Sequence, residues 1–179
     1  MKRISSAVRK KAEKISLLLL DVDGVLTDGR IIIDDRGAET KHFDVRDGQG
    51  IALLMQAGIQ VGFITARKSK VVAFRARELG VAIVHQGVRS KADAYRSIQH
   101  ETGIAEAQIA YVGDDIVDLP ILDRVGLAVT VRDGWPELFS VVDYVTEACG
   151  GRGAVREVAE LLLRAQNKWV ELTKQYRQI

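Results

Sequence analysis

Apolar residues of this chain occur in short runs that are separated by longer segments with helical spacing. The runs are typical of buried strands and cover 16–20, 61–64, 82–84, 109–112, 127–129 and 144–145. Between them, the spacing of apolar positions predicts helices over 48–57, 68–79, 90–102, 115–124 and 153–176. This alternation predicts an α/β fold, a doubly wound Rossmann-like parallel sheet with helices on both faces, and one domain over residues 1–179.

One segment after the first strand breaks the alternation. Residues 30–33 and 38–44 flank Asp34, Asp35, Arg36 and Gly37, which are typical turn residues, so we expect a small β-hairpin flap. Its first strand carries three adjacent isoleucines, so both of its faces need cover, and association of subunits would supply it. The remaining sequence leaves no room for a separate cap domain.

Charge and composition exclude several classes of function. The formal net charge of +2 is too small to indicate a polyanionic partner. Basic residues do crowd the first fourteen positions, where Ile4, Val8, Ala12 and Ile15 recur at helical spacing. A solvated face of an amphipathic helix explains them better than nucleic-acid or membrane binding. They are Lys2, Arg3, Arg9, Lys10, Lys11 and Lys14.

The location of the protein is constrained by two further features. The apolar run 17–20 is too short for a secretory signal or a membrane span. The single cysteine, Cys149, cannot form an internal disulfide, which is compatible with a reducing compartment. A cytoplasmic location is therefore expected.

Acidic side chains and a lysine follow the predicted strands, at the sheet edge where ligands of such folds bind. Asp21 and Asp23 come after the first strand and share one face if the segment is extended, with Gly24 permitting a sharp exit. Asp114 follows the strand 109–112. Carboxylates brought together in this way form a hard oxygen site suited to Mg²⁺.

Each motif also has a purely structural interpretation. Asp-Gly is a common turn, Gly-Asp-Asp can cap a helix, Thr65 can do the same, and a lysine such as Lys91 is usually solvated. A calcium-binding EF-hand loop starting at Asp21 is excluded, because Leu26 and Ile32 would occupy its glycine and glutamate positions. The order and placement of the motifs favour a functional site over separate structural roles.

That order resembles the haloacid dehalogenase superfamily of phosphatases over essentially the whole chain. The shared features are DVDGVLTDG, a strand-ending Thr65, Lys91 opening a helix, and GDDIVD. DVRDGQGI, HQGVRSK and GGRGAVREV resemble, more narrowly, a capless branch that acts on an eight-carbon sugar acid phosphate in lipopolysaccharide biosynthesis. One departure is Ala66 where the superfamily often has glycine, which would strain the backbone if the position needs positive φ.

The resemblance implies a mechanism through a covalent phosphoenzyme. Asp21 would attack phosphorus and form an aspartyl-phosphate, while Asp23 would protonate the leaving oxygen and later activate water. Asp21, the backbone carbonyl of Asp23, and Asp114 would hold Mg²⁺.

Other residues would support this reaction without breaking or forming bonds themselves. Thr65 and Lys91 would neutralise phosphate charge, and Lys91 would also bind the substrate, as would Asp23. Asp115 and Asp118 would orient metal waters and Lys91 without binding metal directly.

Recognition of a sugar acid needs cations beyond Lys91, and Arg67 and Arg75 are candidates. The resemblance implies further sugar contacts at the end of the flap, made between neighbouring subunits of a homotetramer. Without the resemblance, these residues fit an ordinary helix start. They are Asp44, Val45, Arg46, Asp47, Gly48 and Ala52. The segment 150–153, with Arg152, is either a mobile anion-reading loop or a flexible turn.

Two other functions use similar residues. A receiver-type signalling domain also combines aspartates, a threonine and a lysine, but its acidic pair precedes the phosphoacceptor, whereas DVDG comes first in this chain. A related capless phosphatase could instead act on a nine-carbon, sialic-acid-type sugar phosphate. Fold class alone does not distinguish the two sugars.

Overall fold

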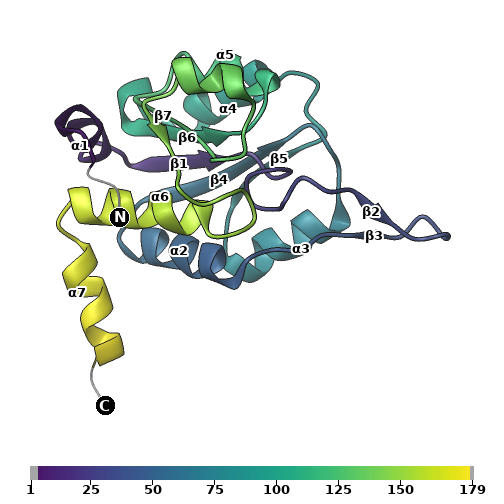
Figure 1. Ribbon diagram of the computed structural model, residues 1–179, viewed down its shortest axis with the longest axis horizontal. Helices are drawn as coiled ribbons and strands as arrows, with labels where there is room; N and C mark the ends of the chain where they lie inside the picture. The colour runs from purple at the N-terminus through teal and green to yellow at the C-terminus, as the bar shows by residue number, and fades with distance from the viewer. Residues whose placement is uncertain (1–3, 178–179) are drawn as a thin grey trace.

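The computed structural model describes residues 4–177 and contains a six-stranded sheet (Figure 1). Its order is β5-β4-β1-β6-β7-β8, and all neighbouring strands are parallel. The strands are β1 (Leu17–Leu20), β4 (Gln60–Thr65), β5 (Ile83–Gln86), β6 (Ile109–Gly113), β7 (Leu127–Thr130) and β8 (Tyr144–Val145). The six predicted strands and the α/β class are confirmed. Lys2 and Arg3 lie outside the described residues.

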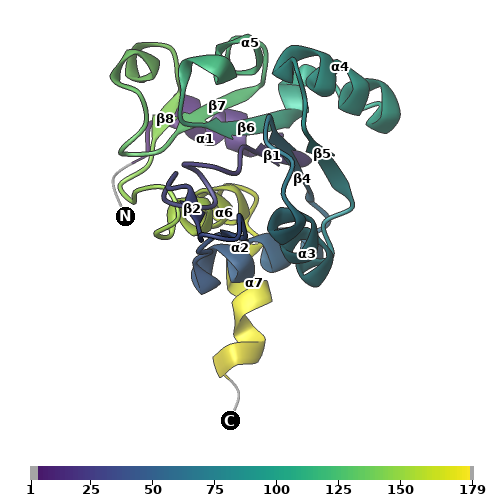
Figure 2. The same cartoon turned by 90° about the vertical axis from the view of Figure 1, so that its right-hand side faces the viewer.

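Helices cover both faces of the sheet, as Figures 1 and 2 show. One face packs against α1 (Ser6–Ala12), α2 (Val45–Gln56), α3 (Lys70–Leu79) and α6 (Ala154–Ala165), and the other against α4 (Lys91–Thr102) and α5 (Leu119–Leu122). Side chains of β1 alternate between them: Leu18 and Leu20 face the first layer, Leu17 and Leu19 the second. All four side chains are fully buried. Burial of each one stabilises the fold by about 1.5–3 kcal/mol.

Capping side chains set several helix starts away from their predicted positions. Helix α2 begins three residues before the predicted 48, because the Asp44 side chain accepts the Arg46 N–H at 2.7 Å. Helix α3 begins two residues after the predicted 68, because Ser69 caps it through the Val72 N–H. The predicted helix 115–124 is a 3₁₀ turn, Ile116–Asp118, followed by the short α5. Two more 3₁₀ turns are Glu106–Gln108 and Pro136–Ser140.

The predicted single helix over 153–176 is wrong. Helix α6 ends at Ala165, and a separate helix α7 (Trp169–Lys174) leads into a 3₁₀ turn, Gln175–Arg177. Asn167 breaks the chain direction with a φ of 58°. The Trp169 ring then lies against the guanidinium groups of Arg156 and Arg164, at 5.2 and 4.5 Å from its centroid. No described helix has the length and apolar character to cross a membrane.

The predicted flap is present but has much shorter strands than 30–33 and 38–44. It consists of β2 (Ile32–Ile33) and β3 (Glu39–Thr40), paired antiparallel, and projects from the body in Figure 1. The Asp34 carboxylate accepts the N–H groups of Arg36 and Ala38 and closes its turn. The three isoleucines, Ile31, Ile32 and Ile33, are 54, 39 and 56% exposed. Residues 4–177 contain no separate cap domain.

Candidate active site

Three strand ends bring the predicted catalytic side chains together. Asp21 follows β1, Thr65 ends β4 and Asp114 follows β6, and β1 lies between the other two strands. The carboxyl ends of parallel strands therefore meet at one sheet edge. A cavity of about 170 Å³ opens there. It is lined by Asp21, Asp23, Thr65, Ala66, Arg67, Lys91, Asp114, Asp115 and Val117.

Three carboxylates crowd the floor of this site. Oxygens of Asp21, Asp114 and Asp118 lie within 4.8 Å of one another. Burial raises the pKa of Asp21 to about 6, although Lys91 opposes the shift. Burial, together with the charges of Asp21 and Asp118, raises the pKa of Asp114 to about 8. One lysine does not neutralise this cluster, so a divalent cation would relieve a repulsion that is otherwise left in the fold.

Gly24 makes this crowding sterically possible. Its φ is +97°, and a Cβ atom built on it would lie 2.0 Å from Oδ2 of Asp114. Any side chain at this position would therefore push the Asp114 carboxylate away. The glycine predicted to provide a sharp exit also makes room for a candidate metal ligand.

Asp118 is fully buried, and its oxygens are occupied by donors of the protein. Oδ1 accepts from the Lys91 ammonium at 2.5 Å and from the Tyr111 hydroxyl. Oδ2 accepts the backbone N–H groups of Asp114 and Asp115 at 3.0 and 3.2 Å. Asp21 and Asp114 line the cavity and Asp118 does not, so Asp21 and Asp114 are the candidate ligands of a cation. Asp118 instead supports Lys91 and the turn at Asp114 and Asp115.

Lys91 opens α4 and points into the carboxylate cluster. Its side chain is 6% exposed, and Nζ lies 3.0 Å from Oδ2 of Asp21. Burial disfavours the ammonium, but the charges of Asp21 and Asp118 outweigh burial and raise the pKa of Lys91. The ammonium is therefore fixed and charged beside the predicted nucleophile.

The second motif provides a hydroxyl without backbone strain. Thr65 is 2% exposed, and its Oγ1 accepts the Arg67 N–H at 3.2 Å. Asn167 is the one non-glycine residue in 4–177 with a positive φ, so Ala66 has none. Alanine in place of the usual glycine is accommodated because this turn stays in the ordinary region of φ.

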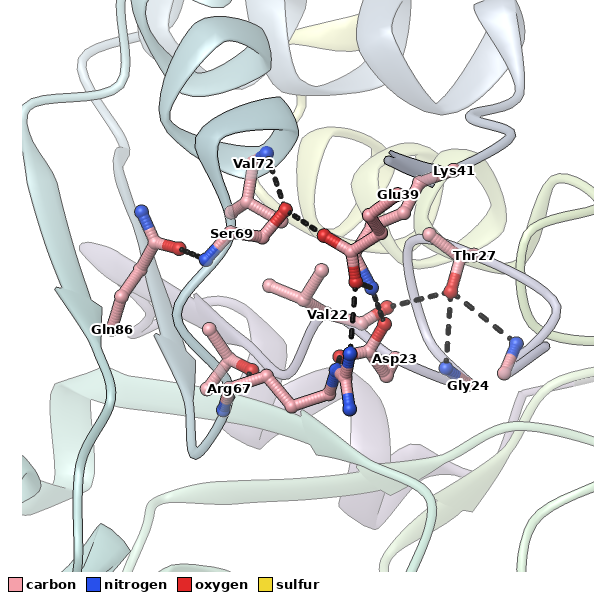
Figure 3. Close-up of polar contacts among 12 residues, drawn as sticks. Val22, Asp23, Gly24, Thr27, Glu39, Lys41, Arg67, Ser69, Val72 and Gln86 are labelled. Carbon is pink, nitrogen blue, oxygen red and sulfur yellow. Dashed lines mark hydrogen bonds and ion pairs between the residues drawn. The ribbon is translucent and has the colours of Figure 1, made fainter. Parts of the chain in front are cut away.

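Asp23 belongs to a charged network that joins the base of the flap to the cavity (Figure 3). Its Oδ1 accepts from the Lys41 ammonium, and Arg67 Nε lies 3.9 Å from its Oδ2. Glu39 binds Lys41 at 3.4 Å, Arg67 at 3.0 Å and the Ser69 hydroxyl at 2.5 Å. Lys41 and Glu39 are not predicted from the sequence, because charged residues beside a hairpin turn are usually solvated.

The predicted sugar contacts at the end of the flap and Arg75 lie outside this cavity of their own chain. Asp44 pairs with Arg46 at 2.7 Å, whereas Val45 is 78% exposed. Arg75 lines a different cavity of about 320 Å³, with Val45 and with Phe43, Val71, Phe74 and Glu78. A Cβ atom on Gly48 would lie 2.4 Å from Nη2 of Arg75, and Ala52 is half-buried in α2.

The Asp47 side chain binds backbone groups of another helix. It is 1% exposed and accepts the N–H groups of Arg156 at 2.7 Å and Gly153 at 3.3 Å, at the start of α6. Burial raises its pKa to about 6, against these hydrogen bonds. Asp47 thus joins α2 to α6.

The segment 150–153 is packed against the loop that follows Asp21. The Gly151 N–H donates to the Val25 carbonyl at 2.8 Å, and Gly150 donates to Asp133 at 2.8 Å. A Cβ atom on Gly150 would lie 1.6 Å from the Gly24 carbonyl oxygen. Its glycines serve close backbone packing, whereas Arg152 is exposed and its carbonyl accepts from Arg46 at 3.3 Å.

Comparison with known proteins agrees with this geometry. Residues 69–155 match the haloacid dehalogenase-like hydrolases. The chain is 48% identical over 165 residues to the 3-deoxy-D-manno-octulosonate 8-phosphate phosphatase KdsC of Escherichia coli K12, covering 92% of this chain and 88% of that one.

Solved structures of phosphatases are also similar to this chain. The phosphatase of that name from Moraxella catarrhalis, in complex with a magnesium ion, a phosphate ion and KDO, superposes with a TM-score of 0.93. It is 41% identical and covers 95% of this chain and 98% of its own. The cobalt-bound deoxy-D-mannose-octulosonate 8-phosphate phosphatase of Haemophilus influenzae gives a TM-score of 0.87 at 39% identity, over 92% and 97% of the two chains.

Proposed function

Because this chain belongs to the 3-deoxy-D-manno-octulosonate 8-phosphate phosphatases of the haloacid dehalogenase superfamily, we propose that it hydrolyses this sugar acid phosphate with Mg²⁺. The products are 3-deoxy-D-manno-octulosonate and phosphate, in lipopolysaccharide biosynthesis. The main support for this function is that Asp21, Asp114 and Lys91 line the same cavity. That arrangement offers a nucleophile, a cation site and a fixed positive charge to one phosphate group.

Asp21 is the proposed nucleophile. Its carboxylate attacks phosphorus, the bond between phosphorus and the sugar oxygen breaks, and an aspartyl-phosphate forms. Lys91 at 3.0 Å and the buried hydroxyl of Thr65 lie at the cavity where the equatorial phosphate oxygens would collect charge. Water then attacks the phosphorus of the aspartyl-phosphate and regenerates Asp21.

Asp23 is the proposed acid and base. It donates a proton to the departing sugar oxygen and takes one from the water that attacks the aspartyl-phosphate. Asp23 lies two residues after Asp21 and lines the same cavity. The two steps therefore need one carboxyl group that changes its protonation state in between.

The cavity suits Mg²⁺. Asp21 and Asp114 supply hard anionic oxygens, and the backbone carbonyl of Asp23 is the proposed third protein ligand. When bound, Mg²⁺ neutralises charge on the phosphate and removes the repulsion between these carboxylates. Asp115 at the cavity wall and Asp118 beneath it would hold metal waters and Lys91 in place.

We propose that the sugar acid is recognised across a subunit boundary in a homotetramer. Arg67 lines the chain's own cavity, whereas Arg75 and the helix-start residues lie away from it, so they would serve a neighbouring site, with Asp47 fixing this helix start on α6. The helix-start residues are Asp44, Val45, Arg46, Gly48 and Ala52. Exposed apolar residues support such contacts: Ile31 and Ile33 of the flap, and Phe74 at 67% exposure. Multi-angle light scattering would test the tetramer, and an Ile33→Asp variant should shift it toward smaller species.

A cytoplasmic location is proposed as well. Cys149 is a free thiol in the structure, and reduced cysteine is the normal state in that compartment. Fractionation of cells that produce the protein would test the location.

Phosphate release measures the proposed activity directly. With Mg²⁺, we expect a strong preference for 3-deoxy-D-manno-octulosonate 8-phosphate over a nine-carbon sugar acid phosphate and over hexose phosphates. Asp21→Asn should remove turnover, because it removes the nucleophile while keeping the shape. Equal turnover of all substrates would contradict the proposed specificity, and an active Asp21→Asn variant would contradict the mechanism.

A further inference from the structure

Lys41 is a charged residue at the base of the flap whose side chain is buried. Its side chain is only 1% exposed, although the neighbouring flap residues Ile32 and Ile33 are exposed. Burying an ammonium group is costly unless carboxylates compensate it. Lys41 has two such partners, Asp23 and Glu39, as Figure 3 shows. The chain thus directs a flap lysine inward to the proposed acid and base.

The two oxygens of Asp23 have different surroundings. Oδ1 accepts from Lys41. Oδ2 is buried without a hydrogen-bond partner in the described structure, and its nearest cation, Arg67 Nε, is 3.9 Å away. A buried carboxylate oxygen without a partner is uncommon. Asp23 lines the cavity, and because Oδ1 already accepts from Lys41, Oδ2 is the carboxylate oxygen whose acceptor positions are unused.

Glu39 holds the lysine in this position. Its carboxylate contacts Lys41 at 3.4 Å, Arg67 at 3.0 Å and the Ser69 hydroxyl at 2.5 Å. Ser69 is the N-terminal cap of α3, which is part of the core. The flap strand β3 is therefore fixed to the end of α3, and Lys41 follows that strand by one residue.

From this geometry we propose that Lys41 is a positioning residue for catalysis, held by Glu39. It binds Oδ1 of Asp23 and so aims Oδ2 at the oxygen that leaves phosphorus or at the attacking water. The inference rests on the proposed phosphatase function and adds a role for the base of the flap. A merely structural ion pair would attach the flap without affecting proton transfer, so the experiment must separate these roles.

Two substrates whose leaving groups differ in basicity distinguish a role in proton transfer from a purely structural role. The sugar oxygen leaves as a strong base and needs a proton, whereas p-nitrophenolate leaves readily without one. kcat/KM reports the steps up to formation of the aspartyl-phosphate, so it should be measured for both phosphate esters. The variants are Lys41→Met, Glu39→Gln, Asp23→Asn and the double variant Asp23→Asn with Lys41→Met. Lys10→Met, at an exposed lysine of α1, is the matched control.

General acid catalysis contributes about 10²- to 10⁴-fold, so Lys41→Met should lower kcat/KM for the sugar phosphate by about 30- to 100-fold. The loss on p-nitrophenyl phosphate should stay below about threefold, since little proton transfer is needed there. Glu39→Gln should also lower kcat/KM more for the sugar phosphate than for p-nitrophenyl phosphate, but by a smaller factor than Lys41→Met. Adding Lys41→Met to Asp23→Asn should cause little further loss, because the group it positions is already absent.

Equal losses on both esters, or an undiminished effect of Lys41→Met in the Asp23→Asn background, would overturn the inference and leave Lys41 a structural residue. If Lys41→Met does not fold, as judged by thermal unfolding, Glu39→Gln decides by the same ratio. Failure of the proposed function gives a different result, because the unmodified protein would then show no preferred release of phosphate from the sugar acid phosphate before any residue is changed.

Discussion

Gly24→Ala tests whether the close approach of the Asp21 loop to Asp114 builds the metal site. An alanine Cβ would lie 2.0 Å from Oδ2 of Asp114, and real Cβ contacts essentially never fall below 3.0 Å. The carboxylate must therefore retreat by about 1 Å. Mg²⁺ requires oxygen ligands near 2.0–2.1 Å in almost ideal octahedral geometry, so a displacement of about 1 Å removes a ligand.

The expected loss of Mg²⁺ affinity can be bounded. Disturbing only the partners of a metal ligand typically lowers affinity about 10- to 100-fold, so loss of a ligand should cost at least about 100-fold. That corresponds to about 2.7 kcal/mol of binding free energy. Positive φ adds a separate penalty of about 1–2 kcal/mol to folding stability. Calorimetric Mg²⁺ titration measures the first quantity, and urea unfolding in EDTA measures the second.

Gly29→Ala is the matched control for this experiment. Gly29 lies in the same loop with a φ of +74°, but its Cβ would meet nothing closer than 3.5 Å. It should therefore show a similar loss of folding stability and nearly normal Mg²⁺ affinity. If Gly24→Ala bound Mg²⁺ within about threefold of Gly29→Ala, the steric argument for Asp114 as a ligand would be refuted.

Three further predictions concern charge. Asp118→Asn, which leaves Lys91 with one buried partner, should lower the free energy of unfolding by about 3 kcal/mol; an unchanged urea midpoint would contradict this. Burial raises the pKa of Asp21 to about 6 and that of Asp114 to about 8, above the ordinary 3.8. The folded protein therefore binds more protons than the unfolded chain between these values, so the metal-free free energy of unfolding should fall as pH rises from about 4 to about 8. Mg²⁺ should then raise Tm more at pH 8.5 than at pH 6, and an equal shift would argue against these ligands. Asp47→Ala should cost about 1–2 kcal/mol in urea unfolding without changing Mg²⁺ affinity, because it caps α6; lost metal binding would contradict a structural role.

The strands and the catalytic edge are predictable from sequence because their physical causes are local. A run such as 17–20 is apolar at every position since β1 is buried on both faces, and the next residue, Asp21, is then placed at the sheet edge. Helix ends are less predictable. Asp44 and Ser69 start α2 and α3 through specific side-chain hydrogen bonds, and apolar spacing alone does not contain those bonds. The break at Asn167 is closed by backbone hydrogen bonds, from the N–H groups of Asn167 and Lys168 to the carbonyls of Arg164 and Leu163, which apolar spacing does not contain either.

Asp47 illustrates a second limit. The family resemblance implies a sugar contact for Asp47, yet its carboxylate binds backbone N–H groups about a hundred residues away, at Gly153 and Arg156. Such a pairing follows from α2 lying against α6, which is a property of the assembled layers. Local sequence shows an acid near a helix start but not which helix it caps.

The network around Asp23 shows why the most informative residues can be the hardest to predict. Glu39 and Lys41 are separated by one position, so in an extended segment they share a face, and one face of the flap base therefore carries opposite charges. That pattern alone fits a solvated hairpin. A functional role is indicated only by the structure, in which Lys41 is buried against Asp23 and Glu39 binds Ser69 and Arg67. An ionic pair directed inward from a flap is expensive to bury, and its position beside an acid that must transfer protons gives a physical reason for keeping it.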